Sequence, residues 1–156
     1  MAFDAYLKID GINGESTDAN HKDWLQLTSY RLPVTRTQSG PGRSGPAVSE
    51  LTITKLMDAA SPKLYEAINK GTHLKEAVIE LVHTSGKAPF LVIRLTDVVI
   101  ASALDDAEAT GTAKFPMETI SLNYSKIQWT YTQQKADGSA AGTVATEWTV
   151  AQAPAA

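Results

Sequence analysis

The chain of 156 residues contains no cysteine, which excludes disulfide bonds and thiolate metal ligands. Histidine is scarce as well: His21, His73 and His83 are the only three, and no two of them have the spacing of metal ligands. Histidines scattered in this way are interpreted as surface or hairpin residues. The sequence therefore predicts no metal site and no cofactor.

Long apolar runs and basic clusters are also missing. The longest apolar stretch, Val98–Ala101, is far too short to cross a bilayer. The N-terminal residues lack the basic and apolar segments of a signal peptide. The 14 basic and 17 acidic residues are spread along the chain, with a net charge of −3, so no patch is suited to a phosphate backbone. We expect synthesis in the cytoplasm, no membrane insertion, no nucleic-acid partner, and any export to proceed without such a signal.

Catalytic patterns are absent too. The segment Gly42-Arg-Ser-Gly-Pro46 lacks the second flanking glycine of a nucleophile elbow, and it lacks the lysine and hydroxyl ending of a phosphate-binding loop. The carboxylates of Asp105-Asp-Ala-Glu108 follow a strand and are interpreted as a solvated turn, with a weak cation site as the alternative. The sequence indicates a protein that is not an enzyme.

What the chain does have is alternation with a period of two. Phe3, Ala5, Leu7 and Ile9 alternate with polar residues, which predicts a strand with one buried face. A second extended segment runs from Trp24 to about Val34, and its apolar parity changes between Leu27 and Tyr30, as at a bulge or bend. Further strands are predicted over Leu51–Met57, Leu74–His83, Phe90–Ile100, Thr119–Tyr131 and Thr143–Val150.

Two connections and one corner follow from the same pattern. Residues 84–89 and Asp137-Gly138 are typical of hairpin loops. The apolar parity changes again around Ser125, which indicates a corner of a barrel or of a two-sheet sandwich.

One short helix interrupts the strands, at about residues 62–70. Ser61 is a suitable N-cap, Pro62 suits the first helical position and Gly71 suits the residue just after the end. Leu64, Ala67 and Ile68 form its apolar stripe. We therefore expect a mainly β domain of about eight strands over residues 1–150, with one flanking helix and a flexible tail over 151–156.

A long protruding loop is expected at about residues 37–48. In its centre, from Gln38 to Pro46, five of nine residues are glycine or proline and none can contribute to a core. A loop of this length in a compact domain is usually functional or disordered.

Seven stretches of the chain form a recognisable ordered set: Phe3-Asp-Ala-Tyr-Leu-Lys-Ile-Asp10, Gly14-Glu-Ser16, Thr52-Ile-Thr-Lys55, Ala60-Ser-Pro-Lys-Leu64, Leu74-Lys-Glu-Ala77, Leu95-Thr-Asp-Val-Val-Ile100 and Ile120-Ser-Leu-Asn-Tyr-Ser-Lys-Ile-Gln-Trp-Thr-Tyr-Thr-Gln133. In this order they resemble the hemolysin-coregulated protein (Hcp) family, the inner-tube subunit of the type VI secretion apparatus. The last strand departs from the family, with Glu147-Trp-Thr149 where a Gly-Trp-Asp-like triplet is usual.

The resemblance implies a two-sheet β-barrel that assembles into hexameric rings. Stacked rings would form a tube that is secreted with effectors and that meets the spike, sheath and baseplate proteins of the apparatus. Two alternatives stay open: a ring-shaped carrier or chaperone that binds effectors in its lumen, and a phage-type tail-tube protein.

The resemblance also suggests two sets of functional residues. The family's equivalent of the protruding loop reaches the neighbouring ring, which assigns subunit or ring-stacking contacts to Gln38, Ser39, Gly40, Pro41, Gly42, Arg43, Ser44, Gly45 and Pro46. The region of residues 30–32 faces the lumen in the family, so Arg31 is expected to face cargo and to favour acidic effectors. The alternatives are a flexible linker for the loop, and for Arg31 an exposed strand residue paired with a nearby carboxylate.

Overall fold

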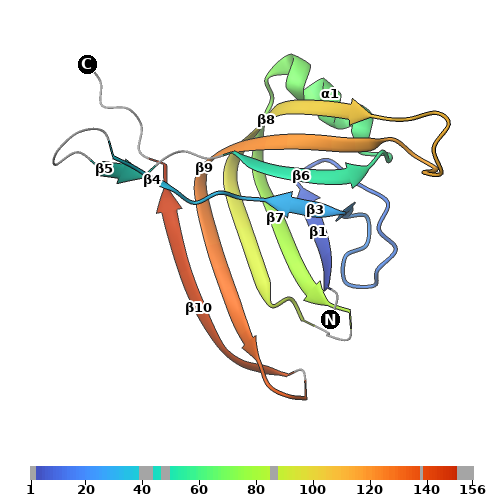
Figure 1. The fold of residues 1–156 in the computed structure, drawn as a ribbon. Coiled ribbons are helices and arrows are strands. Elements are labelled where there is room, and N and C mark those ends of the chain that lie inside the picture. Colours follow the sequence, from blue (N-terminus) through green and yellow to red (C-terminus); the bar gives the residue numbers. More distant parts are fainter. Residues whose placement is uncertain (1–2, 39–43, 47–49, 85–87, 138, 151–156) are drawn as a thin grey trace.

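The computed structural model describes residues 3–38, 44–46, 50–84, 88–137 and 139–150. Figure 1 shows strands that curve around a core, with one helix at the end of the molecule remote from the N-terminus. The elements are β1 Phe3–Ile9, β2 Leu25–Leu27, β3 Ser29–Arg31, β4 Arg36–Gln38, β5 Ser44–Pro46, β6 Leu51–Leu56, α1 Ser61–Lys70, β7 His73–His83, β8 Leu91–Asp106, β9 Met117–Gln134 and β10 Ala140–Thr149.

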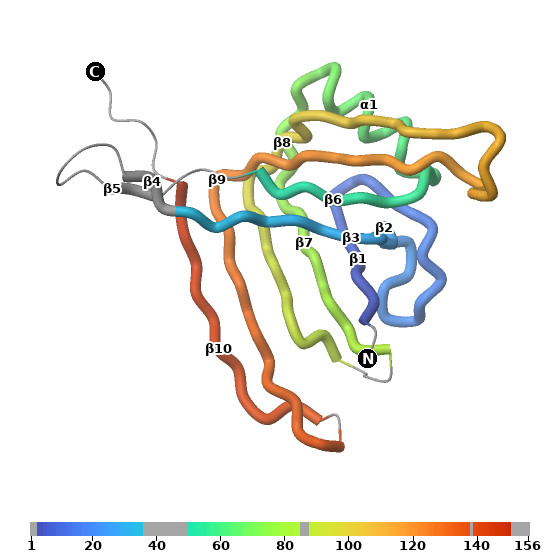
Figure 2. Tube along the Cα trace, viewed as in Figure 1, coloured from blue at the N-terminus to red at the C-terminus, as the bar shows by residue number. Residues whose placement is uncertain are grey.

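The main sheet runs in the order β2-β1-β7-β8-β9-β6-β3, and β10 pairs with the second half of β9. All of its pairs are antiparallel. Only Thr28 separates β2 from β3, so one bent segment pairs with β1 at one end of this order and with β6 at the other. The backbone N–H of Thr28 also donates to the carbonyl of Thr54 at 2.8 Å. The sheet is therefore a nearly closed barrel, which confirms the predicted mainly β architecture (Figure 2).

The core forms because the predicted alternation places one side of each strand inside the barrel. Leu7 and Ile9 of β1, Ile79 of β7 and Leu95 of β8 are almost fully buried. Leu64 and Ala67 bring the apolar stripe of α1 onto the same core. Burial of each such side chain stabilises the fold by roughly 1.5–3 kcal/mol before entropic costs.

β8 and β9 bend where the sheet changes direction, and the bend has a visible cause. Asp97 lies between the paired residues Thr96 and Val98 without a partner of its own in either ladder, and its φ is +54°. Its carboxylate accepts a hydrogen bond from Ser125 Oγ at 2.8 Å and contacts His73 Nδ1 at 2.9 Å. Along β9 the fully buried positions change parity between Leu122 and Ile127, which confirms the corner predicted around Ser125.

The helix ends as predicted but begins differently. Gly71 adopts a left-handed conformation (φ +62°), and the N–H groups of Gly71 and Thr72 donate to the carbonyls of Ile68 and Ala67, which closes the last turn in a Schellman motif. The prediction that Ser61 caps the N-terminus is wrong. The N-cap is Ala60, without a side-chain hydrogen bond, and Ser61 is the first helical residue. Its hydroxyl forms hydrogen bonds with Lys55, Asp58 and Glu118 instead.

Three further expectations need correction. β8 continues to Asp106, so Asp105 and Asp106 lie in a strand opposite Glu118 and Met117 and not in a loop. Val34 is exposed and outside any strand, because the segment from Trp24 forms only two short strands. The segment around residues 37–48 contains the hairpin β4–β5, which is separate from the main sheet (Figure 1). Ser39–Arg43, residues 47–49, Gly138 and the tail 151–156 lie outside the described residues.

Candidate assembly surfaces

A buried polar cluster that contains Lys55 and Glu118 lies at the start of α1. Lys55 Nζ donates to Glu118 Oε1 at 2.7 Å, to Asp58 Oδ1 at 2.8 Å and to Ser61 Oγ at 3.1 Å. The Ser61 hydroxyl donates to the same Glu118 oxygen at 2.5 Å and accepts from the Asp58 N–H at 3.0 Å. Lys55 and Glu118 are both fully buried, so no substrate can reach either side chain.

The electrostatics of this cluster explain why its charges are tolerated inside. Burial alone would raise the pKa of Glu118, but hydrogen bonds from Lys55, Ser61 and Tyr65 outweigh that effect and lower the pKa to about 2. Burial raises the pKa of Tyr65, and the carboxylates of Glu118 and Asp105 beside its hydroxyl raise it further. The cluster joins α1 to β6, β8 and β9. We interpret it as a structural anchor.

Metal and membrane sites find no support in the described part of the chain. No group of three or more histidines and carboxylates is close enough there to hold a metal ion. No helix among the described residues is long and apolar enough to cross a membrane.

Arg31 lies in β3 and is exposed on the outer side of the barrel, the side opposite the core. Successive strand pairs place it in a row with Thr52, Ser121 and Ser102, whose neighbours Ile53 and Ile120 face the core. A second row nearby begins with Ser29 and Thr54, whose hydroxyls are 2.5 Å apart. In residues 3–38, 44–46, 50–84, 88–137 and 139–150, no carboxylate forms an ion pair with Arg31. These residues therefore do not support the alternative of a carboxylate partner for Arg31. Its neighbours across the strands are serine and threonine residues.

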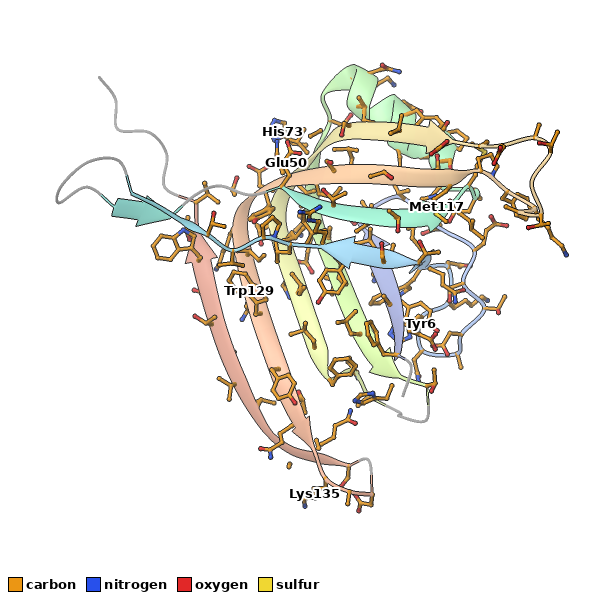
Figure 3. The ribbon with its side chains drawn as sticks, viewed as in Figure 1. Tyr6, Glu50, His73, Met117, Trp129 and Lys135 are labelled. Carbon is orange, nitrogen blue, oxygen red and sulfur yellow. The ribbon has the colours of Figure 1, made fainter. Side chains whose placement is uncertain are left out.

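The core-facing side of the sheet continues onto β9 and β10, where its side chains are exposed. One row across the strands runs Leu27, Ala5, Leu81, Leu91, Tyr131 and Val144. Exposure along this row rises from 3% at Leu81 to 49% at Tyr131 and 74% at Val144. Trp148, on the same side of β10, is 48% exposed. We call Tyr131, Val144 and Trp148 the open face. Figure 1 shows the β9–β10 hairpin extending beyond the barrel, and Figure 3 shows Trp129 on its inner side.

Among the strands that the structure describes, β10 has one edge without a partner. It pairs with β9 on one side only, and every residue of β10 is exposed. Such an edge presents backbone N–H and C=O groups that can pair with another chain. The sequence predicted β10 as a strand, but alternation says only which side chains share a face. It does not say whether another element covers that face.

A groove of about 670 Å³ lies between the first loop (residues 10–24), β2, the end of β6 and Phe115. Its lining combines apolar Leu27, Leu56 and Phe115 with the carboxylates of Glu15 and Asp58. We call it the end groove. Figure 1 shows the β4–β5 hairpin at one end of the molecule and the connection from β8 to β9, which contains Phe115, at the opposite end.

The predicted stacking segment is only partly described. Gln38 pairs with Ser44 and Gly45 with Thr37, while Ser39–Arg43 lie outside the described residues. The hairpin follows β3 in the chain, so Arg31 and the stacking segment are joined by a short connection and do not form one site.

The prediction that all three histidines are surface or hairpin residues is wrong for His21. This residue is buried, and its ring contacts two carboxylates.

Comparison with known proteins gives consistent matches. The family model described as "Type VI secretion system effector, Hcp" matches residues 6–131. Protein hcp1 of Pseudomonas aeruginosa is 29% identical, over 97% of this chain and 98% of the relative. The Major exported protein of the same organism is 26% identical, over 89% of this chain and 95% of the relative. A solved structure of a type six secretion system protein superposes with a TM-score of 0.85 at 31% identity and 96% coverage of both chains.

Proposed function

The chain belongs to the Hcp family of type VI secretion proteins, and from this premise we propose that it is a structural subunit of the secretion tube. In this proposal hexameric rings of the chain stack into a tube that is exported with effectors. The observation that carries the proposal is the open face, because a monomer would leave these apolar side chains in water.

A second copy is the partner that this surface favours. The open face and the free edge of β10 lie at one side of the sheet, where β10 pairs only with β9. A contact between two unlike surfaces of identical chains is heterologous, and such contacts either close into rings or extend into filaments. Covering an interface of standard size removes roughly 1,600 Å² in total from water.

Native mass spectrometry of the purified full chain tests the ring. Each chain has a mass of 16.7 kDa, so a closed hexamer has six times that mass, about 100 kDa. Light scattering at high protein concentration and physiological salt should give the same mass. A monomer under both conditions would contradict the proposal.

For ring stacking, we propose that the segment Gln38–Pro46 of one ring contacts the end groove of the next. Residues 35–49 carry Arg36 and Arg43 and no acidic residue. The opposite end of the molecule carries Glu15 and Asp58 in the end groove. The stretch that leads to Phe115 adds Asp106, Glu108 and Lys114, so acidic residues outnumber basic ones in this set. A basic end and an acidic end favour head-to-tail stacking.

The stacking proposal is tested by replacing Gly40–Gly45 with a Gly-Ser link. Loop length affects stability only weakly, by about 0.6 kcal/mol per doubling, so the melting temperature should barely change while tubes fail to form. The matched control shortens the 84–89 connection, which joins β7 to β8 in the chain and is not proposed to stack, and should leave tubes intact. Normal tubes from the chain shortened at 40–45 would refute this role.

For cargo, we propose that Arg31 faces the lumen of the ring. Six copies would place a circle of positive charge on a wall of serine and threonine hydroxyls, which would retain acidic effectors and hold few apolar ones. This surface also favours a carrier role alongside the structural one. Arg31→Ser should weaken retention of an acidic effector most at low salt, with Lys126→Ser on β9 as the control. Unchanged retention at every salt concentration would remove Arg31 from the lumen.

For localisation, we propose synthesis in the bacterial cytoplasm and export through the type VI apparatus, where the tube meets spike, sheath and baseplate proteins. Appearance of the chain in the medium should be lost when the sheath is deleted. Export that continues without the sheath would contradict this route.

A further inference from the structure

His21 occupies an unusual position for a histidine in a polar loop. It is only 4% exposed, although it belongs to the first loop. Its ring stacks on Tyr6 of β1, with centroids 4.2 Å apart and an interplanar angle of 8°, and the Trp24 ring meets it edge-on at 4.7 Å. Figure 3 shows Tyr6 on the side of the barrel near this loop.

Both ring nitrogens of His21 contact carboxylates. Nδ1 lies 2.7 Å from Asp18 Oδ2 in the same loop, and Nε2 lies 2.8 Å from Glu80 Oε1 on β7. A carboxylate oxygen only accepts hydrogen bonds, so each contact needs a proton on the ring nitrogen. A neutral imidazole has one N–H and would set a lone pair against one carboxylate. The geometry therefore fits the doubly protonated, positively charged ring.

We propose that His21 is a pH-sensitive latch: the protonated ring ties the first loop to β7, and loss of one ring proton releases the loop. Asp18 lies in the loop and Glu80 lies in the barrel wall, so this single side chain bridges the two. The proposal is independent of ring formation.

The released element would be the strand-like turn inside the first loop. Ser16 N–H donates to the Trp24 carbonyl at 3.0 Å and Asp23 N–H donates to the Ser16 carbonyl at 2.9 Å. Asp23 has a φ of +65°, which is unfavourable for a residue with a side chain and must be held by its surroundings. Glu15 and Ser16 line the end groove, so release of the latch would move one wall of that groove.

The groups in contact with His21 keep one protonation state near neutral pH, so the imidazole is the group whose protonation would change. The hydrogen bond with His21 is the largest cause that lowers the pKa of Asp18, which stays ionised in neutral solution. Burial, and then the charges of Asp18 and Asp4, raise the pKa of Tyr6, which stays a neutral phenol. The other charged groups around the latch lie in the loop, on β1, on β7 and on β8: Lys22, Asp23, Lys8, Asp10, Lys75, Glu76 and Arg94.

Hydrogen exchange and ¹⁵N NMR of the full chain, labelled at histidine, test the latch directly. At about pH 6 both ring nitrogens of His21 should carry protons. After correction for intrinsic rates, the amides of Ser16, Asp23 and Trp24 should exchange about tenfold faster at about pH 9 than at about pH 6, the scale expected for losing a hydrogen bond between charged groups. Amides of β7 near Ile79 should keep their protection.

Two variants separate the latch from general effects of pH. His21→Gln should give fast loop exchange at both pH values, because both donor hydrogens of the amide are on one nitrogen, whereas the two carboxylates contact two different ring nitrogens. His73→Gln should keep the wild-type response, since His73 contacts Asp97 but is 71% exposed. Equal loop protection at both pH values in the wild type would overturn the proposal, and so would a neutral His21 ring at about pH 6. A pH response that survives in His21→Gln would overturn it as well.

Discussion

Two parts of the same sheet differ in what faces their apolar side. On β1 and β7 the inward side chains, among them Leu7 and Ile79, are fully buried under the barrel. On β9 and β10 the same side of the sheet carries Tyr131, Val144 and Trp148, which are 48–74% exposed. Both sets of side chains are large and apolar or aromatic, and they differ in whether other parts of the chain pack over them. The packed part of the sheet stabilises the chain, and in the proposed ring the open face contacts a neighbouring copy.

Substitution in the packed part should therefore change folding, and the largest effect is expected at the buried cluster. Lys55→Met leaves Glu118 charged and without its main partner, which costs about 3–5 kcal/mol of unfolding free energy. The double variant Lys55→Met with Glu118→Leu should recover most of that loss, because no unpaired charge remains. Urea denaturation of both variants measures the difference, and equal loss in both would show that the pair is not coupled.

Acid should weaken the same cluster. The hydrogen bonds hold the pKa of Glu118 at about 2, below its ordinary value of 4.5. A depressed carboxyl pKa contributes stability that is present above the ordinary value and is lost as the pH falls toward the folded value. Other carboxylates with lowered pKa values, such as Asp97, respond in the same direction, so a variant is needed for comparison. The stability gap between the wild type and Glu118→Gln should narrow between about pH 5 and about pH 2. A constant gap would contradict this assignment.

A smaller effect is expected at the end of the helix. Gly71→Ala places a side chain at φ +62° and should lower stability by about 1 kcal/mol. Space is not the cause, since no atom beyond the adjoining backbone lies within 4 Å of the new Cβ position. Thermal melting measures the change, and Gly142→Ala, also without close neighbours but lacking a positive φ, serves as the control. Equal melting of the two variants would show that conformation at Gly71 carries no cost.

Local features of the chain were predictable, and distant pairings were not. The alternation in Phe3–Ile9 and the pair Pro62 and Gly71 act within a few residues, so the strand and the helix could be located from the sequence. The partners of Ser61 and His21 could not, because Glu118 and Glu80 lie 57 and 59 residues away in the chain. The open face illustrates the same limit: the sequence does not tell whether Trp148 lies in a core or at an interface, and only its exposure separates the two.

The central claim is that the open face of β9 and β10 is covered by a second copy of the chain. Adjacent residues of β10 offer a matched test, because Val144 and Ala145 are both exposed but point to opposite sides of the sheet. We would measure the mass of Val144→Lys and Ala145→Lys by light scattering at equal concentration. The account predicts that Val144→Lys is a folded monomer and Ala145→Lys keeps the mass of the ring. A ring formed by Val144→Lys as readily as by the wild type would contradict it.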